Sequence, residues 1–316
     1  MKIAVIDDYQ NVFRSMSGYG KLKDHEVIVF NKGAGSEDEL VDMLRDADAV
    51  ILTQQRTAMP RSVIERLPRL KLISQTGRNT AHIDQAACKE KGIVISAGGG
   101  GGPTATAELA WGLILAVARH IPEEVTALKS GRWQTTLGTG MHGKALGVYA
   151  YGRIGSIVAQ VGKAFGMKVV CWGRDGSTAR AREAGYDVAA SREVFFAESD
   201  VISLHLPMNK ETQGIVKATD LALMKPSAIL INTSRAGIIE PGALIAGLKA
   251  GRPGRAGVDV YEKEPVLNGD HPLLSMSNVV CTPHLGYVEA DIYEALFGSA
   301  VDQILAFANG KSINVV

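Results

Sequence analysis

Short apolar segments alternate with helical patterns along nearly the whole chain, and this alternation constrains the fold more than any other feature. Parallel strands need a long crossover connection, usually a helix. A repeated strand–helix order therefore predicts an α/β protein with doubly wound parallel sheets. The predicted strands form two series, the first at residues 2–7, 26–30, 49–53, 70–74 and 93–96, and the second at residues 145–150, 168–172, 200–206, 228–233, 255–260 and 279–282.

Two series of strands indicate two domains, in agreement with a length of 316 residues. Five consecutive glycines at residues 98–102 separate the series, and their backbone freedom predicts a hinge or a close-approach loop rather than a strand or helix. The last predicted helix, at residues 289–308, is too small to be a domain. We expect it to pack on the first domain. A domain of residues 1–97 and 288–316 is then interrupted by a domain of residues 98–287.

Charge and cysteine content exclude several classes of protein. The chain has 34 Lys and Arg against 33 Asp and Glu, spread along its length, which predicts no binding to nucleic acid. No segment reaches about 18 consecutive apolar residues, so we expect no membrane span. The N-terminus leads directly into a strand without a secretory signal pattern, which predicts a cytoplasmic protein. The three cysteines match neither a metal pair nor a disulfide framework, and no metal site is expected.

A glycine turn between two strands of the second series predicts a phosphate-binding site. Residues 144–175 combine an apolar strand, a glycine turn, an amphipathic helix and a second strand. Backbone N–H groups at the start of such a helix accept a pyrophosphate. Gly152 would allow the pyrophosphate to approach, and Gly155 would allow the helix to pack on the strand. Ala150 occupies the place of the usual first glycine, so a simple tight turn is the alternative reading.

The residues that follow the next strand favour NADP(H) as the cofactor, with NAD(H) as the alternative. An enzyme specific for NAD usually has Asp or Glu there to bind the ribose hydroxyls. This chain has Gly173 and Arg174 instead, and a guanidinium can pair with a 2′-phosphate. In the alternative, Arg174 stacks on the adenine or faces solvent, and Asp175 binds the ribose.

Three polar residues follow predicted strands of the second series, at the sheet edge where α/β proteins bind ligands. Arg235, Glu264 and His284 are suited to the reduction of a 2-keto acid. Arginine can anchor the carboxylate and polarise the ketone, and histidine can protonate the oxygen as hydride arrives. A carboxylate beside the histidine would stabilise its charged form and fix its tautomer. Each residue alone could be a solvated or structural group, but together they favour an active site.

Seven motifs, in order along nearly the whole chain, resemble the D-isomer-specific 2-hydroxyacid dehydrogenase family. They are LPRLKLISQTGRNTAHID, TAELAWGLILAVAR, YGRIG, SLHLPMNKETQGIV, LMKPSAILINTSRAGIIE, AGVDVYEKEP and TPHLG. The resemblance implies a Rossmann-type nucleotide domain inserted into a flavodoxin-like substrate domain, and a homodimer built around the long helix after the glycines. It also implies reduction of a small 2-keto acid to the D-2-hydroxy acid, with Arg235, Glu264 and His284 as the catalytic arginine, glutamate and histidine.

The glycine turn, the residues after the next strand and the same resemblance together indicate which residues contact the cofactor and the substrate. The cofactor residues are Thr106, Tyr151, Gly152, Arg153, Ile154, Gly155, Gly173, Arg174, His205, Leu206, Pro207, Thr212, Thr233, Ser234 and Asp259, and the substrate residues are Gly77, Arg78 and Asn79. Gly77, Arg78 and Asn79 replace the family's glycine-rich carboxylate loop. Arg78 either adds a second cation, which would favour a substrate with another anionic group, or faces solvent.

Two other functions are compatible with these motifs. One is the D-3-phosphoglycerate dehydrogenase reaction, because short versions of that enzyme exist. The other is a nucleotide-sensing corepressor scaffold, because some relatives use the fold for protein interaction. The absence of charged or Pro-rich tails argues against the scaffold.

Overall fold

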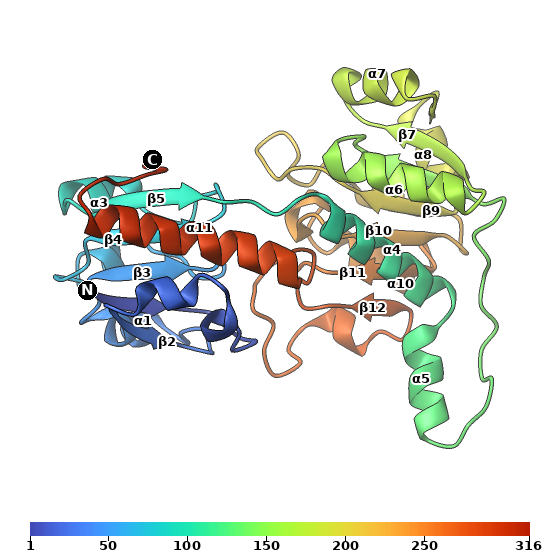
Figure 1. Ribbon diagram of the computed structural model, residues 1–316. Coiled ribbons are helices and arrows are strands. Elements are labelled where there is room, and N and C mark those ends of the chain that lie inside the picture. Colours follow the sequence, from blue (N-terminus) through green and yellow to red (C-terminus); the bar gives the residue numbers. More distant parts are fainter. The chain divides into compact units, whose positions relative to one another are not determined.

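The computed structural model describes all 316 residues and divides the chain into two compact units (Figure 1). Unit 1 consists of Met1–Gly102 and Val288–Val316, and unit 2 consists of Pro103–Tyr287. The glycine run thus ends the first segment of unit 1, whereas the sequence predicts the boundary after residue 97. Each unit contains its own parallel sheet, and the units are described one after the other.

Unit 1 is built on a five-stranded parallel sheet with the strand order β2-β1-β3-β4-β5. This is the flavodoxin-like order, in which the chain reverses its direction of winding beside β1. The strands begin and end within a few residues of the sequence prediction. Their bounds are β1 (Lys2–Val5), β2 (Glu26–Val29), β3 (Ala49–Leu52), β4 (Leu72–Thr76) and β5 (Val94–Gly98).

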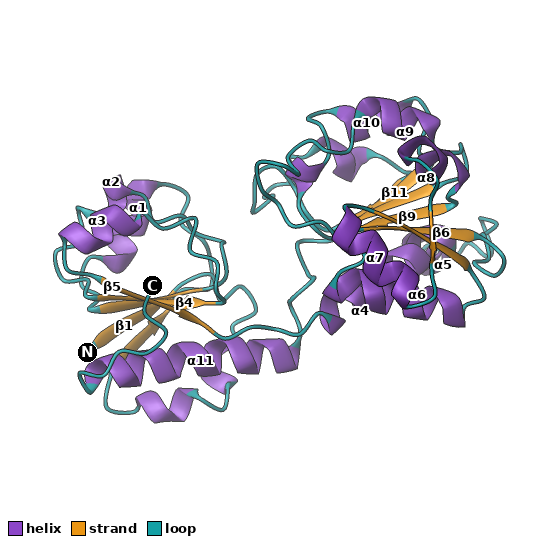
Figure 2. Cartoon of the chain, turned by 90° about the horizontal axis from the view of Figure 1, so that it is seen from above, coloured by secondary structure: helices purple, strands orange, loops and turns teal.

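Helices cover both faces of this sheet (Figure 2). One face carries α1 (Glu37–Leu44), α2 (Arg61–Ile64) and α3 (Gln85–Glu90), and the other carries α11 (Ala290–Ala308). Glu289 caps the N-terminus of α11, because its side chain accepts the backbone N–H groups of Asp291 and Ile292. Buried Ser74 of β4 donates to the carbonyl of Ala300 at 3.0 Å. The C-terminal helix is therefore part of unit 1.

Unit 2 is built on a seven-stranded parallel sheet with the strand order β12-β11-β10-β9-β6-β7-β8. The chain starts at β6, winds out to β8 and returns to β9 on the other side of β6, so the carboxyl end of β6 is the switch point where ligands bind in such sheets. The strands are β6 (Ala145–Tyr149), β7 (Lys168–Trp172), β8 (Asp187–Val188), β9 (Val201–Leu204), β10 (Ile229–Asn232), β11 (Arg255–Val258) and β12 (Val279–Cys281). Together with unit 1, this confirms the predicted class of two doubly wound parallel-sheet domains.

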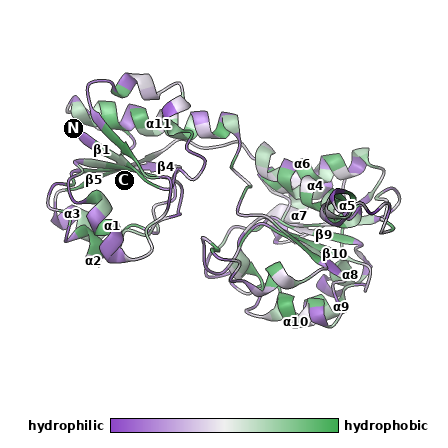
Figure 3. Ribbon diagram, turned by 90° about the horizontal axis from the view of Figure 1, so that it is seen from below, coloured by the Kyte–Doolittle hydropathy of each residue, from purple (hydrophilic) through white to green (hydrophobic).

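The helices of unit 2 form a layer on each face of its sheet (Figure 2). One layer contains α8 (Arg192–Glu198), α9 (Ala218–Leu223) and α10 (Ala243–Lys249). The other contains α4 (Thr104–Ala118), α6 (Arg153–Ala164) and α7 (Asp175–Glu183), and α5 (Ile121–Lys129) follows α4. Figure 3 shows the hydrophobic residues along the strands and as bands on helices such as α11. None of the helices combines the length and the apolar character that a membrane-spanning helix requires.

The prediction for the glycine run is wrong at its first residue, because Gly98 is the last residue of β5. Gly98 pairs with Thr76 of β4, and its carbonyl accepts the N–H of Gly77 at 2.8 Å. Its missing side chain leaves room for the amide of Asn314. The close-approach interpretation also applies to Gly101, where a Cβ atom would lie 2.5 Å from the Ile292 side chain.

Candidate active site

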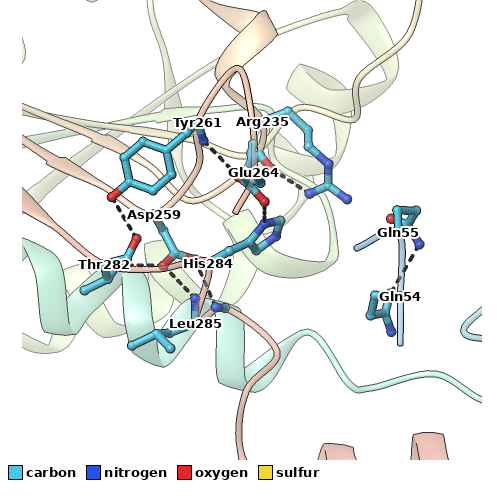
Figure 4. A network of polar contacts seen from close by, with 11 residues as sticks. Gln54, Gln55, Arg235, Asp259, Tyr261, Glu264, Thr282, His284 and Leu285 are labelled. Carbon is cyan, nitrogen blue, oxygen red and sulfur yellow. Dashed lines mark hydrogen bonds and ion pairs between the residues drawn. The ribbon is translucent and has the colours of Figure 1, made fainter. Parts of the chain in front are cut away.

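A histidine–glutamate pair lies at the carboxyl edge of the unit 2 sheet (Figure 4). Nδ1 of His284 is 2.5 Å from Oε2 of Glu264, and both side chains are about one-third exposed or less. The other carboxylate oxygen accepts the N–H of Tyr261 at 2.9 Å. Burial raises the pKa of Glu264, but the hydrogen bonds from His284 and from the N–H of Tyr261, together with the charges of His284 and Arg235, outweigh it, so the net pKa lies below its usual range. The ionised carboxylate can therefore hold the imidazole with Nε2 directed away from the pair.

Buried Asp259 fixes the loop that carries His284. Its carboxylate accepts the Thr282 hydroxyl at 2.6 Å and the N–H groups of Leu285 and Gly286 at 2.7 and 2.9 Å. Thr106 in the first turn of α4 donates to the carbonyl of Gly286 at 2.7 Å. These contacts hold His284 in the left-handed backbone region, at a φ of 53°, which residues other than glycine rarely adopt. The strained backbone position fixes the direction of the imidazole.

Arg235 lies at the end of the neighbouring strand, β10, with its guanidinium near Glu264 (Figure 4). The side-chain amide of Asn232 donates to the carbonyl of Arg235 at 3.0 Å and so fixes the turn after the strand. The guanidinium donates to the carbonyl of Ser234 at 2.7 Å, and the side chain is exposed. The structure therefore brings the three residues predicted to be catalytic together at one edge of one sheet.

The turn between β6 and α6 has the features of an anion site. Gly152 precedes the first residue of α6, and no side chain caps the free N–H groups of this helix. Nothing lies within 4 Å of the position of a Cβ atom on Gly152, whereas a Cβ on Gly155 would collide with the carbonyl of Ala150. Ala150 itself has a φ of 75°, a conformation that favours glycine. The turn thus has the geometry of a dinucleotide-binding turn although alanine replaces its first glycine.

Two residues of α7 contact this turn. The hydroxyl of Ser177 accepts the N–H of Tyr151 at 2.7 Å, and the guanidinium of Arg180 donates to the carbonyl of Tyr151 at 3.2 Å. Arg174, the residue immediately before α7, forms an ion pair of 2.8 Å with Glu211. Arg180 and Glu211 are absent from the sequence prediction. Arg180 lies outside the seven motifs. Glu211 lies within SLHLPMNKETQGIV, but it is 37 residues from its partner, and nothing in the motif indicates that the two residues pair.

Buried polar atoms without partners line the carboxyl ends of β9 and β10. Both ring nitrogens of His205 and the hydroxyl of Thr233 are buried without a hydrogen bond. Burial lowers the pKa of His205 to about 4, so the ring is neutral. A buried polar group without a partner costs about 1–3 kcal/mol, which a bound polar ligand can recover. The open turn and these atoms together fit a dinucleotide.

The remaining predicted cofactor residues lie in the same unit, beside these two features. Thr212 stabilises the loop after β9 by donating to the carbonyl of Pro207 at 2.6 Å. Ser234 donates to the carbonyl of Leu204 at 2.7 Å and so joins the ends of β10 and β9. Arg153 and Ile154 are in the first turn of α6. Gly173 follows β7, and Leu206 lies in the loop after β9.

The predicted substrate loop belongs to unit 1. Gly77 follows β4 with a φ of 85°. The side chain of Asn79 accepts the N–H of Ala81 at 3.0 Å and closes the turn, and Arg78 is exposed at its tip. The loop lies at the carboxyl edge of its own sheet, which is the edge that binds ligands in such folds.

Comparison with known proteins identifies relatives over nearly the whole chain. Residues 111–286 match the family described as D-isomer specific 2-hydroxyacid dehydrogenase, NAD binding domain. Glyoxylate reductase from Thermococcus litoralis is 37% identical over 86% of this chain and 84% of its own length. D-3-phosphoglycerate dehydrogenase from Methanocaldococcus jannaschii is 35% identical over 87% of this chain, which spans only about half (52%) of that longer protein.

A solved structure has the same fold with higher identity. The crystal structure of phosphoglycerate oxidoreductase from Vibrio cholerae is 44% identical and superimposes with a TM-score of 0.94, covering 98% of this chain and 99% of the other.

Proposed function

The chain belongs to the D-isomer-specific 2-hydroxyacid dehydrogenase family, and we propose that Arg235, Glu264 and His284 carry out the reaction of that family in it. The protein is a nicotinamide-dependent oxidoreductase that reduces a small 2-keto acid to the D-2-hydroxy acid. The observation that carries the proposal for its catalytic residues is the contact of 2.5 Å between His284 and Glu264 at the carboxyl edge of a dinucleotide-binding sheet.

Each of the three residues has a separate role in the proposed mechanism. Arg235 binds the substrate carboxylate, and its positive charge polarises the adjacent ketone. His284 donates a proton from Nε2 to the ketone oxygen as the oxygen becomes an alkoxide. Glu264 accepts a hydrogen bond from Nδ1, which keeps the imidazole in position with Nε2 directed to the substrate. In the reverse reaction, the neutral imidazole accepts the proton of the hydroxyl group.

A nicotinamide cofactor, when bound, supplies or accepts the hydride. We propose that the N–H groups of the first turn of α6 bind its pyrophosphate, because this turn is open and uncapped. Neutral His205 and the hydroxyl of Thr233 offer unsatisfied polar atoms to the ligand at the ends of β9 and β10. Asp259 acts mainly through the His284 loop, since its carboxylate oxygens already accept three hydrogen bonds from that loop.

We propose NADP(H) as the preferred cofactor because Arg174 stands at the end of β7, where the ribose of a dinucleotide binds. Arg174→Ser should lower kcat/KM for NADPH about tenfold or more, since hydrogen bonds to charged groups contribute about 1.5–3 kcal/mol. The value for NADH should change less than about threefold. Initial rates with both cofactors test this, and a clear preference of the unchanged protein for NADH would reject the assignment.

The proposed role of Glu264 predicts a change in the pH profile. The low pKa of Glu264 keeps its carboxylate ionised throughout the neutral range. Glu264→Gln keeps an oxygen beside Nδ1 but removes the negative charge, so kcat/KM for ketone reduction should fall at neutral pH, and the acidic fall that protonation of Glu264 causes in the parent protein should disappear. Rates measured between acidic and neutral pH test this change. A lower rate with an unchanged profile would mean that Glu264 contributes only to structure.

The substrate loop of unit 1 is the proposed second binding element for the acid. Gly77, Arg78 and Asn79 lie at a ligand-binding sheet edge, and exposed Arg78 is available to a second anionic group of a substrate. Oxidation of NADPH and NADH should be measured with glyoxylate, hydroxypyruvate, pyruvate, phenylpyruvate, oxaloacetate and 3-phosphohydroxypyruvate. Turnover that yields the D-hydroxy acid supports the proposal. No turnover by folded, nucleotide-binding protein would favour a scaffold function instead.

A second candidate is the D-3-phosphoglycerate dehydrogenase reaction. It is favoured by exposed Arg78, by the 44% identity to the phosphoglycerate oxidoreductase structure and by the longer curated relative. A much higher kcat/KM for 3-phosphohydroxypyruvate than for hydroxypyruvate would select this function, because the two acids differ by the phosphate alone.

We also propose a homodimer that buries α5 and the segment after it. Exposed apolar side chains gather there, with Trp133 75% and Leu137 92% exposed. Glu124 accepts hydrogen bonds from Thr135 and Thr136 and holds the segment against α5. Leu137→Lys should convert dimer to monomer in light scattering at micromolar concentration. The control is Leu223→Lys, at an exposed leucine of α9, which should leave the mass unchanged. A monomeric parent protein would refute the proposal.

A further inference from the structure

An exposed ion pair links the two loops on either side of the phosphate-binding turn. Arg174 follows β7 and Glu211 follows β9, and these two strands are the neighbours of β6 in the sheet. The guanidinium and the carboxylate meet at 2.8 Å. Their link therefore runs across the carboxyl end of β6, where the turn to α6 lies. The residue proposed to bind the 2′-phosphate already has a negatively charged partner.

The backbone around Glu211 is fixed, whereas its side chain remains exposed. The side-chain oxygen of Asn209 accepts the N–H groups of Glu211 and Thr212 at 2.9 and 3.1 Å. Thr212 in turn donates to the carbonyl of Pro207 at 2.6 Å. On the other side, Arg174 precedes α7, and its carbonyl accepts the N–H groups of Ser177 and Thr178 at 2.8 and 3.1 Å. Both side chains of the pair are 72% exposed, so each can change partner at small cost.

We propose that Glu211 is a specificity-determining residue, because its carboxylate competes with the 2′-phosphate of NADP(H) for Arg174. The inference rests on the proposed role of Arg174. A 2′-phosphate carries a charge of about −1.5 to −2 at neutral pH, so it must displace the carboxylate and is repelled by it. NAD(H) has no group that requires Arg174 and leaves the pair intact. Glu211 thus reduces the preference for NADP(H) and favours use of both cofactors.

Calorimetric titration with two cofactor fragments tests this without turnover. Adenosine 2′,5′-bisphosphate contains the 2′-phosphate, and adenosine 5′-monophosphate lacks it. Glu211→Gln should bind the bisphosphate about three- to tenfold more tightly, as expected for an exposed ion pair plus a repulsion, and the monophosphate within about twofold. The gain should shrink as salt is added. The control Glu183→Gln, which removes the same charge from the last turn of α7, should bind both ligands like the parent protein.

Arg174→Gln and the double variant separate this inference from the proposed cofactor preference. If Arg174 binds the phosphate, Arg174→Gln weakens bisphosphate binding, and Glu211→Gln gives a smaller gain in that background, because only the relief of repulsion remains. A loss in Arg174→Gln without a gain in Glu211→Gln overturns the role of Glu211 and leaves that of Arg174. Equal tightening of both ligands, or a gain of undiminished size without Arg174, also overturns it. Unchanged bisphosphate binding in Arg174→Gln overturns both proposals.

Discussion

Replacement of His284 by alanine is expected to lower kcat for 2-keto acid reduction at least about a hundredfold, because a general acid typically contributes about 10²–10⁴ to the rate. The variant lacks the imidazole that protonates the ketone oxygen, and the Glu264 carboxylate loses its contact with His284. Initial rates at saturating cofactor and keto acid measure the loss. Binding of the cofactor should change little, because the phosphate-binding turn is made by other elements.

A second histidine–glutamate pair in unit 2 provides a matched control for this prediction. Nε2 of His271 lies 3.0 Å from Oε2 of Glu262, and His271 immediately precedes the short helix Pro272–Ser275. His271→Ala removes the same groups and should retain turnover within about threefold. An equal loss in both variants would mean that the effect arises from stability. Normal turnover in His284→Ala would reject the general acid.

Arg235→Ala should lower kcat/KM for the keto acid about a hundredfold or more. Two hydrogen bonds from a guanidinium to a carboxylate contribute about 1.5–3 kcal/mol each, and every 1.4 kcal/mol corresponds to a factor of ten. The loss should appear in KM, because the carboxylate is bound before and during the reaction, and in kcat, because the ketone is no longer polarised.

Arg235→Lys distinguishes the geometry of the guanidinium from its charge. Lysine keeps the positive charge but cannot form two parallel hydrogen bonds, so we expect an intermediate kcat/KM. The affinity for adenosine 5′-monophosphate should equal that of the parent protein in both variants. If Arg235→Ala instead weakened nucleotide binding and left the KM of the keto acid unchanged, Arg235 would be a cofactor contact.

The fold could be predicted from the sequence because helices cover both faces of each sheet. A strand of this type is an almost uninterrupted apolar run, and β6, β7 and β9 to β12 were all found within a few residues. The two-residue edge strand β8 was missed because only Asp187 and Val188 pair, and its sequence has no apolar run. Gly98 was assigned to the loop because backbone entropy disfavours glycine in strands, whereas the position of Asn314 requires it there.

The part of the candidate site whose residues directly follow strands could be predicted from the sequence. Arg235 and His284 come within three residues of β10 and β12, so the parallel sheet brings them to one edge. The contact of Glu264 with His284 and the support from Asp259 depend on loop conformations, which no periodicity encodes. The contact of Glu211 with Arg174 could not be predicted from the sequence. The two residues lie in different loops, and an exposed charged side chain is not part of any hydrophobic pattern.

The discontinuous composition of unit 1 sets an order for folding on the ribosome. Residues 103–287 are contiguous, so unit 2 has all its contacts once Tyr287 has left the exit tunnel. Unit 1 at that stage lacks α11, and the side chains that alternate toward that helix, such as Ile3, Ile51 and Leu72, remain open to water. The part of the protein that is synthesised first therefore completes its fold last, and its half-covered sheet is the surface that a chaperone would meet on the nascent chain.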